Sequence, residues 1–129
     1  MKYGKINPLI NSLNAVIGKQ ETKIQKKLFK FAEKIKPYQE DYAKKVEELR
    51  LDNAAADEKG VLLVNEKGDF RYSKEGLKKL QDDVKEHNEK EFDFKKIEVV
   101  NPQGLEDFHF LEDWVTGVTF NPKPEEEEL

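Results

Sequence analysis

The chain has 129 residues, of which 36% are hydrophobic and 39% charged, with a formal net charge of −4, so it fits one domain with a lean core. Eight Phe, four Tyr and one Trp argue against a disordered chain. The absence of Cys excludes disulfides, a thiolate nucleophile and a zinc site built on Cys, and no apolar run reaches the length of a membrane span, so we expect no membrane partner.

The first predicted helix covers residues 8–17. Asn7 is suited to cap it and Pro8 to fill its first turn, where the missing N–H costs nothing. Gly18 marks either the end of this helix or a weak point within one longer helix, and both interpretations stay open.

A long amphipathic helix over residues 19–51 is the element around which the chain is organised. Six apolar residues recur in alternating steps of four and three, so they share one side of this helix. They are Ile24, Leu28, Phe31, Ile35, Tyr38 and Tyr42. Pro37 lies inside the stripe and predicts a kink near residues 33–37, because proline removes one backbone hydrogen bond.

Residues 61–72 predict a β-hairpin. Two runs of β-prone residues, 61–64 and 70–72, flank a polar turn that contains Gly68. The tripeptide Glu-Lys-Gly ends at Gly60 and again at Gly68, which indicates two turns of one chemistry and not a repeat architecture.

A second helix is predicted over residues 73–90, with Ser73 as its N-cap. Leu77, Leu80, Val84 and His87 form a narrow stripe suited to lie along the long helix. If the two helices are antiparallel, Leu80 belongs to the core, and its replacement by Ala should cost about 2–5 kcal/mol.

The C-terminal third combines short elements. Alternating apolar residues predict a strand over 92–100 with a bulge near Lys95, and the spacing of Leu and aromatic residues predicts a helix over 104–115. Pro and Glu residues predict a flexible acidic tail over 121–129.

The predicted fold is therefore α+β and mainly helical. The long helix pairs antiparallel with the second helix, the hairpin lies between them, and the short strand and C-terminal helix complete a single domain over residues 1–120.

No catalytic, cofactor or metal signature is present, so we expect a protein that is not an enzyme and carries no cofactor. Gly18 and Lys19 lack the hydroxyl residue and the distant glycine of a phosphate-binding loop. His109 has acidic neighbours, but without a second imidazole they make a weak metal site. For His109 and His87 alike, a half-buried structural role is favoured.

Two surfaces are candidates for binding. The first is a basic face at helical spacing that could follow a phosphate backbone, although a solvated helix surface is the favoured interpretation because the face has no Arg. It consists of Lys19, Lys23, Lys26, Lys30 and Lys34. The second follows from the long stripe, which the second helix is too short to cover. It predicts either a homodimer through residues 28–35 or docking of the aromatic C-terminal helix. Its candidate residues are Leu28, Phe29, Phe31, Ile35 and Trp114.

The order of features carries a resemblance. A short helix precedes a long Lys- and Glu-rich helix with the pattern Lys-Pro-Tyr-Gln-Glu at 36–40. A polar turn with glycine over 57–69 and a second helix over 73–90 follow. The alternating Glu-Phe-Asp-Phe at 91–94 and a final Leu-rich helix over 105–115 complete the order. This layout resembles a group of small proteins of unknown function encoded by tailed phages and prophages. The resemblance implies a phage context and transfers no active site.

We therefore expect a non-enzymatic interaction protein, a phage-encoded structural, assembly or host-interaction factor of the bacterial cytoplasm or the virion. Its expected partner is a protein, either a second copy or a phage or host protein. The alternative is an accessory protein that binds nucleic acid through the basic face.

Overall fold

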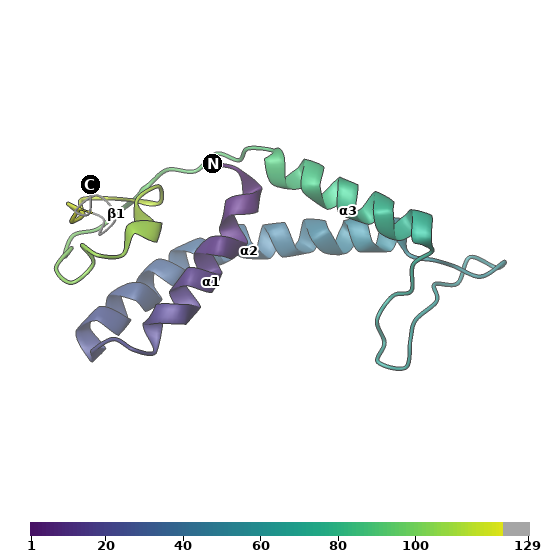
Figure 1. Cartoon of the computed structure of the whole chain (residues 1–129), viewed down its shortest axis with the longest axis horizontal. Coiled ribbons are helices and arrows are strands. Elements are labelled where there is room, and N and C mark those ends of the chain that lie inside the picture. Colours follow the sequence, from purple (N-terminus) through teal and green to yellow (C-terminus); the bar gives the residue numbers. More distant parts are fainter. Residues whose placement is uncertain (123–129) are drawn as a thin grey trace. The chain divides into compact units, whose positions relative to one another are not determined.

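Figure 1 shows the computed structural model, which describes residues 1–122. The part of the chain described is mainly helical, with three α-helices and one two-stranded sheet. The acidic tail predicted over 121–129 lies, from residue 123 on, outside the described residues.

The chain divides into two compact units. The first unit consists of Met1–Lys5 and Pro37–Phe92, and the second of Ile6–Lys36 and the chain from Asp93 onward. Helix α2 (Thr22–Asn53) contributes to both and continues through Pro37. The predicted kink and the single domain over residues 1–120 stay predictions.

Helix α1 (Ile6–Ile17) opens the second unit and ends just before Gly18, which confirms that Gly18 marks a break. It begins two residues earlier than predicted, with Asn7 inside the helix, so the prediction of Asn7 as the cap is wrong. Helix α2 starts at Thr22 and not at residue 19, because a turn connects the two helices. The side-chain amide of Gln25 donates a 3.0 Å hydrogen bond to the Ile17 carbonyl, one of the orphan acceptors at the end of α1.

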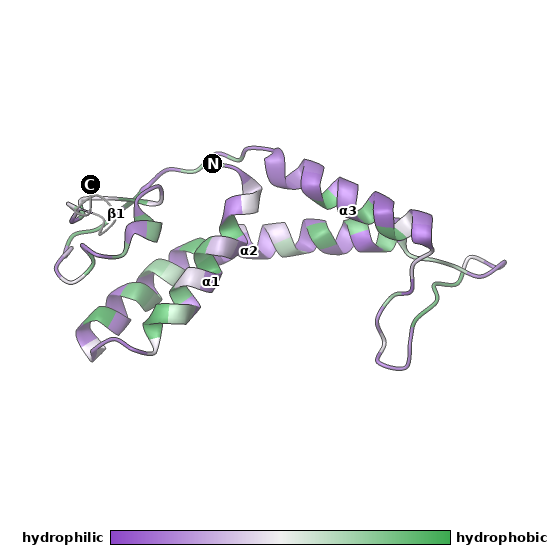
Figure 2. Ribbon diagram, in the orientation of Figure 1, coloured by the Kyte–Doolittle hydropathy of each residue, from purple (hydrophilic) through white to green (hydrophobic). Residues whose placement is uncertain are grey.

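The core of the second unit lies between α1, the first half of α2 and the C-terminal segment. Figure 2 shows apolar residues gathered on α1 and along the first half of α2, whereas α3 is mostly hydrophilic. The buried apolar residues of this unit include Ile6, Leu9, Leu13, Ile24, Leu28, Phe31, Ile35, Leu105, Leu111, Trp114 and Val115. This unit therefore holds nearly all the large apolar side chains that the described chain buries.

The helix predicted over 104–115 is wrong. This segment forms turns and one short 3-10 helix, η2 (His109–Leu111). It ends in strand β2 (Val115–Thr116), which pairs in parallel with β1 (Ile97–Glu98). The Trp114 carbonyl accepts a 2.9 Å hydrogen bond from the Ile97 N–H, so tertiary pairing replaces the helical bond. Short isolated helices are marginal, and burial outweighs spacing here. The strand predicted over 92–100 shrinks to two residues, which need no bulge.

In the first unit, α3 (Lys74–Glu89) runs antiparallel to the second half of α2, as predicted. Tyr42 donates a 2.6 Å hydrogen bond to Asn88, whereas Asn53, later in α2, donates a 3.1 Å bond to Asp83, earlier in α3. Ser73 caps α3, since its hydroxyl accepts the Gly76 N–H at 2.9 Å. The predicted cap is confirmed.

The packing between these two helices is thin. Leu80 is only half-buried and Leu77 is 44% exposed, so the prediction that Leu80 is a core residue is wrong. In the described part of this unit, Tyr42 and His87 are the side chains that reach full burial. Hydrogen bonds such as those of Tyr42 and Asn53 connect the two helices. Leu80→Ala should therefore lower the free energy of unfolding by less than the value of about 2–5 kcal/mol expected for a fully buried Leu.

The hairpin predicted over 61–72 is also wrong. Within residues 1–122, this segment contains no β-strand and forms only isolated antiparallel bridges, Ala56 with Leu62 and Val64 with Phe70. Two tight turns, which consume the residues between the bridges, are the reason. They are described next, because this segment carries the candidate site.

Candidate functional site

Residues 54–72, which we call the double-turn loop, connect α2 to α3 within the first unit. The Asp57 carboxylate accepts backbone N–H bonds from the residues two and four positions later, at 2.8 and 3.0 Å. The Asn65 side chain does the same at 2.8 and 3.1 Å. Gly60 and Gly68 have φ of 82° and 83°, a conformation that favours glycine. The two Glu-Lys-Gly turns therefore share one chemistry, as the sequence predicted.

Three backbone hydrogen bonds then close the loop into a ring. The Ala55 N–H donates to the Arg71 carbonyl at 2.7 Å, and the Arg71 N–H donates to the Leu63 carbonyl at 2.9 Å. The Leu63 N–H completes the ring by donating to the Ala55 carbonyl at 2.9 Å. Successive members are eight residues apart, which is also the spacing of Asp57 and Asn65. The loop is therefore a braced structure, although none of its residues is buried.

The double-turn loop presents apolar side chains to solvent. Its central residues are Val61, Leu62, Leu63 and Val64, with exposed fractions of 59%, 38%, 36% and 51%. Leu51 and Leu77, on the helices that flank the loop, are 43% and 44% exposed. Single exposed apolar residues are ordinary, but four in succession form a feature that marks an interaction site. We call residues 61–64 the apolar segment.

The basic face is accessible. All five of its lysines are exposed: Lys23, Lys26, Lys30 and Lys34 on α2, and Lys19 in the turn before it. Among the described residues, none of the five forms an ion pair. Lys27 behaves differently, since it donates a 2.6 Å hydrogen bond to the Gln103 carbonyl and is partly buried.

The predicted protein interface is mostly inside the chain. Leu28, Phe31, Ile35 and Trp114 are buried within the second unit, and only Phe29 is exposed, at 55%. These buried side chains are therefore covered within the chain itself, and a homodimer through residues 28–35 stays a prediction that only the exposed Phe29 could serve. The predicted C-terminal helix is not helical, and its Trp114 lies edge-on to Phe94, outside the stripe, at 5.1 Å.

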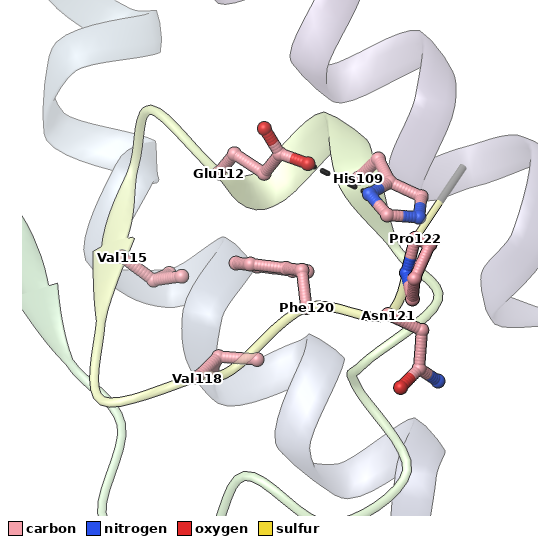
Figure 3. Close-up of a pocket in the computed structure, with 7 residues that line it drawn as sticks. All are labelled: His109, Glu112, Val115, Val118, Phe120, Asn121 and Pro122. Carbon is pink, nitrogen blue, oxygen red and sulfur yellow. Dashed lines mark hydrogen bonds and ion pairs between the residues drawn. The ribbon is translucent and has the colours of Figure 1, made fainter. Parts of the chain in front are cut away.

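An open hollow of about 530 Å³ lies in the second unit. Figure 3 shows the residues that line it. It is lined by His109, Glu112, Val115, Val118, Phe120, Asn121 and Pro122. The His109 Nδ1 lies 2.7 Å from a Glu112 oxygen, and the His109 ring lies 5.9 Å from that of Phe120. Glu112 is one of the acidic neighbours of His109 in the sequence, whereas the wall formed by residues 118–122 was not predicted.

A His–Glu pair can orient an imidazole and hold a proton on it. Among residues 1–122, the side chains that line the hollow include no Ser, Thr, Cys or Lys. Within residues 1–122, no group of three His, Asp or Glu side chains is placed to hold a metal ion. His109 is half-buried, and its structural role stays a prediction.

His87 is buried more deeply than predicted. Its side chain is 8% exposed, and neither ring nitrogen has a hydrogen-bond partner in the described structure. The ring stacks on Tyr3 at 4.4 Å and faces Tyr42 at 5.9 Å. Burial lowers the pKa of His87 from 6.5, and the positive charges of Lys45 and Lys90 lower it further.

Comparison of the chain with protein-family models, curated proteins and solved structures finds no match. No helix in the described range combines the length and the apolar character needed to cross a bilayer. The functional argument therefore rests on the chemistry of the surfaces above.

Proposed function

We propose that this is a non-enzymatic interaction protein that binds a protein partner through the double-turn loop. The observation that carries the proposal is the apolar segment, in which four consecutive apolar side chains are exposed. Covering such side chains releases about 25 cal/mol for each Å² of apolar surface removed from water. A partner protein is the ordinary source of that cover.

The construction of the loop supports this role. Its side-chain and backbone hydrogen bonds hold the apolar segment in one conformation before binding, so a partner would not have to order it. Each turn places a Glu-Lys pair beside the apolar segment, at 58–59 and 66–67. An apolar centre with a charged rim is the usual anatomy of a protein interface.

The layout shared with small tailed-phage proteins supports a more specific role. In that context the protein is a structural, assembly or host-interaction factor, acting in the bacterial cytoplasm or in the virion.

The test is a pull-down from the native host and from phage particles with three forms of the chain. The Leu62→Asp/Val64→Asp variant alters the apolar segment, and Val100→Asp is the matched control because Val100 is 83% exposed in the other unit. A partner retained by the wild type and by the control, but lost by the double variant, supports the proposal. Identical captures by all three forms would refute it, provided that circular dichroism shows equal helix content.

A second candidate function is nucleic-acid binding through the basic face. The observation that favours it is that all five lysines are exposed and unpaired among the described residues. Contacts with phosphates weaken steeply as salt rises, whereas an apolar interface does not. A gel shift at low salt that is abolished by Lys23→Gln/Lys26→Gln/Lys30→Gln would support it. No shift at low salt would remove this candidate.

A further inference from the structure

We propose that the apolar segment pairs with the same segment of a second copy, as two antiparallel β-strands joined edge to edge. The inference rests on the proposed function, because it takes the double-turn loop as the contact surface. It adds the identity of one partner and the way in which that partner is bound.

The backbone of the apolar segment has one used edge and one free edge. On the used edge, Leu63 donates to Ala55 and accepts from Arg71, and the Val61 carbonyl accepts from Asp57 at 2.9 Å. In extended backbone, residues two apart point their N–H and C=O groups to the same side, and intervening residues point theirs to the other side. The groups of Leu62 and Val64 therefore face away from the loop. Neither residue has a hydrogen bond among those of the described chain.

This free edge is self-complementary. Leu62 and Val64 together offer two backbone N–H donors and two C=O acceptors on this edge. An antiparallel strand of the same kind satisfies all of them when Leu62 of one copy lies opposite Val64 of the other. A two-fold axis then makes the arrangement close at two chains, the usual symmetry of a homodimer.

The side chains do not oppose this pairing. Natural proteins protect exposed strand edges with Lys, Pro or inward-pointing charges, but residues 61–64 contain only Val and Leu. Val and Leu at these positions also bury apolar surface when the two strands meet. The charged side chains lie in the flanking turns, outside the residues that pair.

The test is the solution mass of the full chain by light scattering, from micromolar to several hundred micromolar. The wild type should approach twice the chain mass of 15.1 kDa as concentration rises. Leu62→Lys/Val64→Lys should remain at the chain mass, with a dissociation constant raised at least about a hundredfold, and Val100→Lys should behave as the wild type. Val64→Pro, which deletes an N–H that the single chain leaves unused, should also remain monomeric.

Two results would overturn the pairing: a wild type that stays at the chain mass at every concentration, or a dimer that survives both loop variants. Circular dichroism confirms that each variant keeps its helices. A monomeric wild type whose captured partner is still lost on loop substitution would leave the proposed function standing and assign the free edge to another protein. A wild type that dimerises through the loop, with loop variants that capture the same partners as the wild type, would support the pairing and refute the proposed function.

Discussion

Replacing His87 by Phe should stabilise the protein at neutral pH. The imidazole carries one donor and one acceptor nitrogen, and neither has a partner in the described structure, although the ring is 8% exposed. A buried polar group without a hydrogen bond costs about 1–3 kcal/mol. Phe keeps the stacking on Tyr3 and Tyr42 and removes the orphan nitrogens. We therefore expect the free energy of unfolding to rise by about 1–3 kcal/mol.

The same substitution should remove a dependence on acid. The pKa of His87 is lowered from 6.5 in the folded chain, so the folded chain binds this proton less readily than the unfolded chain does. Stability linked to His87 is therefore fully present above pH 6.5 and is lost as the pH falls from there through the folded-state pKa. Over that window the loss is at most about 1.4 kcal/mol per pH unit, the limit for one proton. His87→Phe should flatten this slope.

Urea unfolding followed by circular dichroism between pH 8 and pH 5.5 measures both effects. His109→Gln is the matched control, because His109 is the other histidine of the chain and has Glu112 as a partner. The control should not gain stability at pH 8, because the His109 imidazole already has a hydrogen-bond partner. If His87→Phe lowers stability at pH 8, or if its slope between pH 6.5 and 5.5 equals that of the wild type, the reasoning about the orphan imidazole is refuted.

Three further substitutions test the architecture by urea unfolding. Leu28→Ala should cost about 2–5 kcal/mol because Leu28 is 0% exposed, whereas Phe29→Ala, at a 55% exposed position, should stay near zero; equal costs would contradict the assigned core. Ser73→Ala should cost about 1 kcal/mol through loss of the cap of α3, and an unchanged midpoint would deny the cap a role. Gly104→Ala should cost more than about 1 kcal/mol, since its φ is 90° and a Cβ would collide with the side chain of Ile24. Gly18→Ala is the control, because Gly18 has open space around it, and similar midpoints for the two variants would refute the reasoning.

The candidate site illustrates how far local patterns reach. The repeated Glu-Lys-Gly predicted two turns of one chemistry, because Asp57 and Asn65 need only their near neighbours to close them. The ring of bonds through Ala55, Leu63 and Arg71 is not predictable in this way, since each bond joins residues at least eight positions apart. The exposure of the apolar segment has the same origin. Four apolar residues in sequence suggest a buried strand, and only the tertiary structure leaves them in solvent.

The sequence by itself determined α1, α2 and α3, their approximate ends and the cap at Ser73. These depend on a spacing of three and four residues and on contacts within one turn, which the local sequence carries. What covers the stripe of α2 was decided by the tertiary structure. Leu28 and Ile35 looked available for a second copy, and they are buried because α1 and the C-terminal segment lie over them. Residues 104–115 have helical spacing, but the pairing of β1 with β2 and the burial of Trp114 favour turns. A contact between residues far apart in the chain does not produce a regular spacing of apolar residues, so local sequence patterns do not predict it.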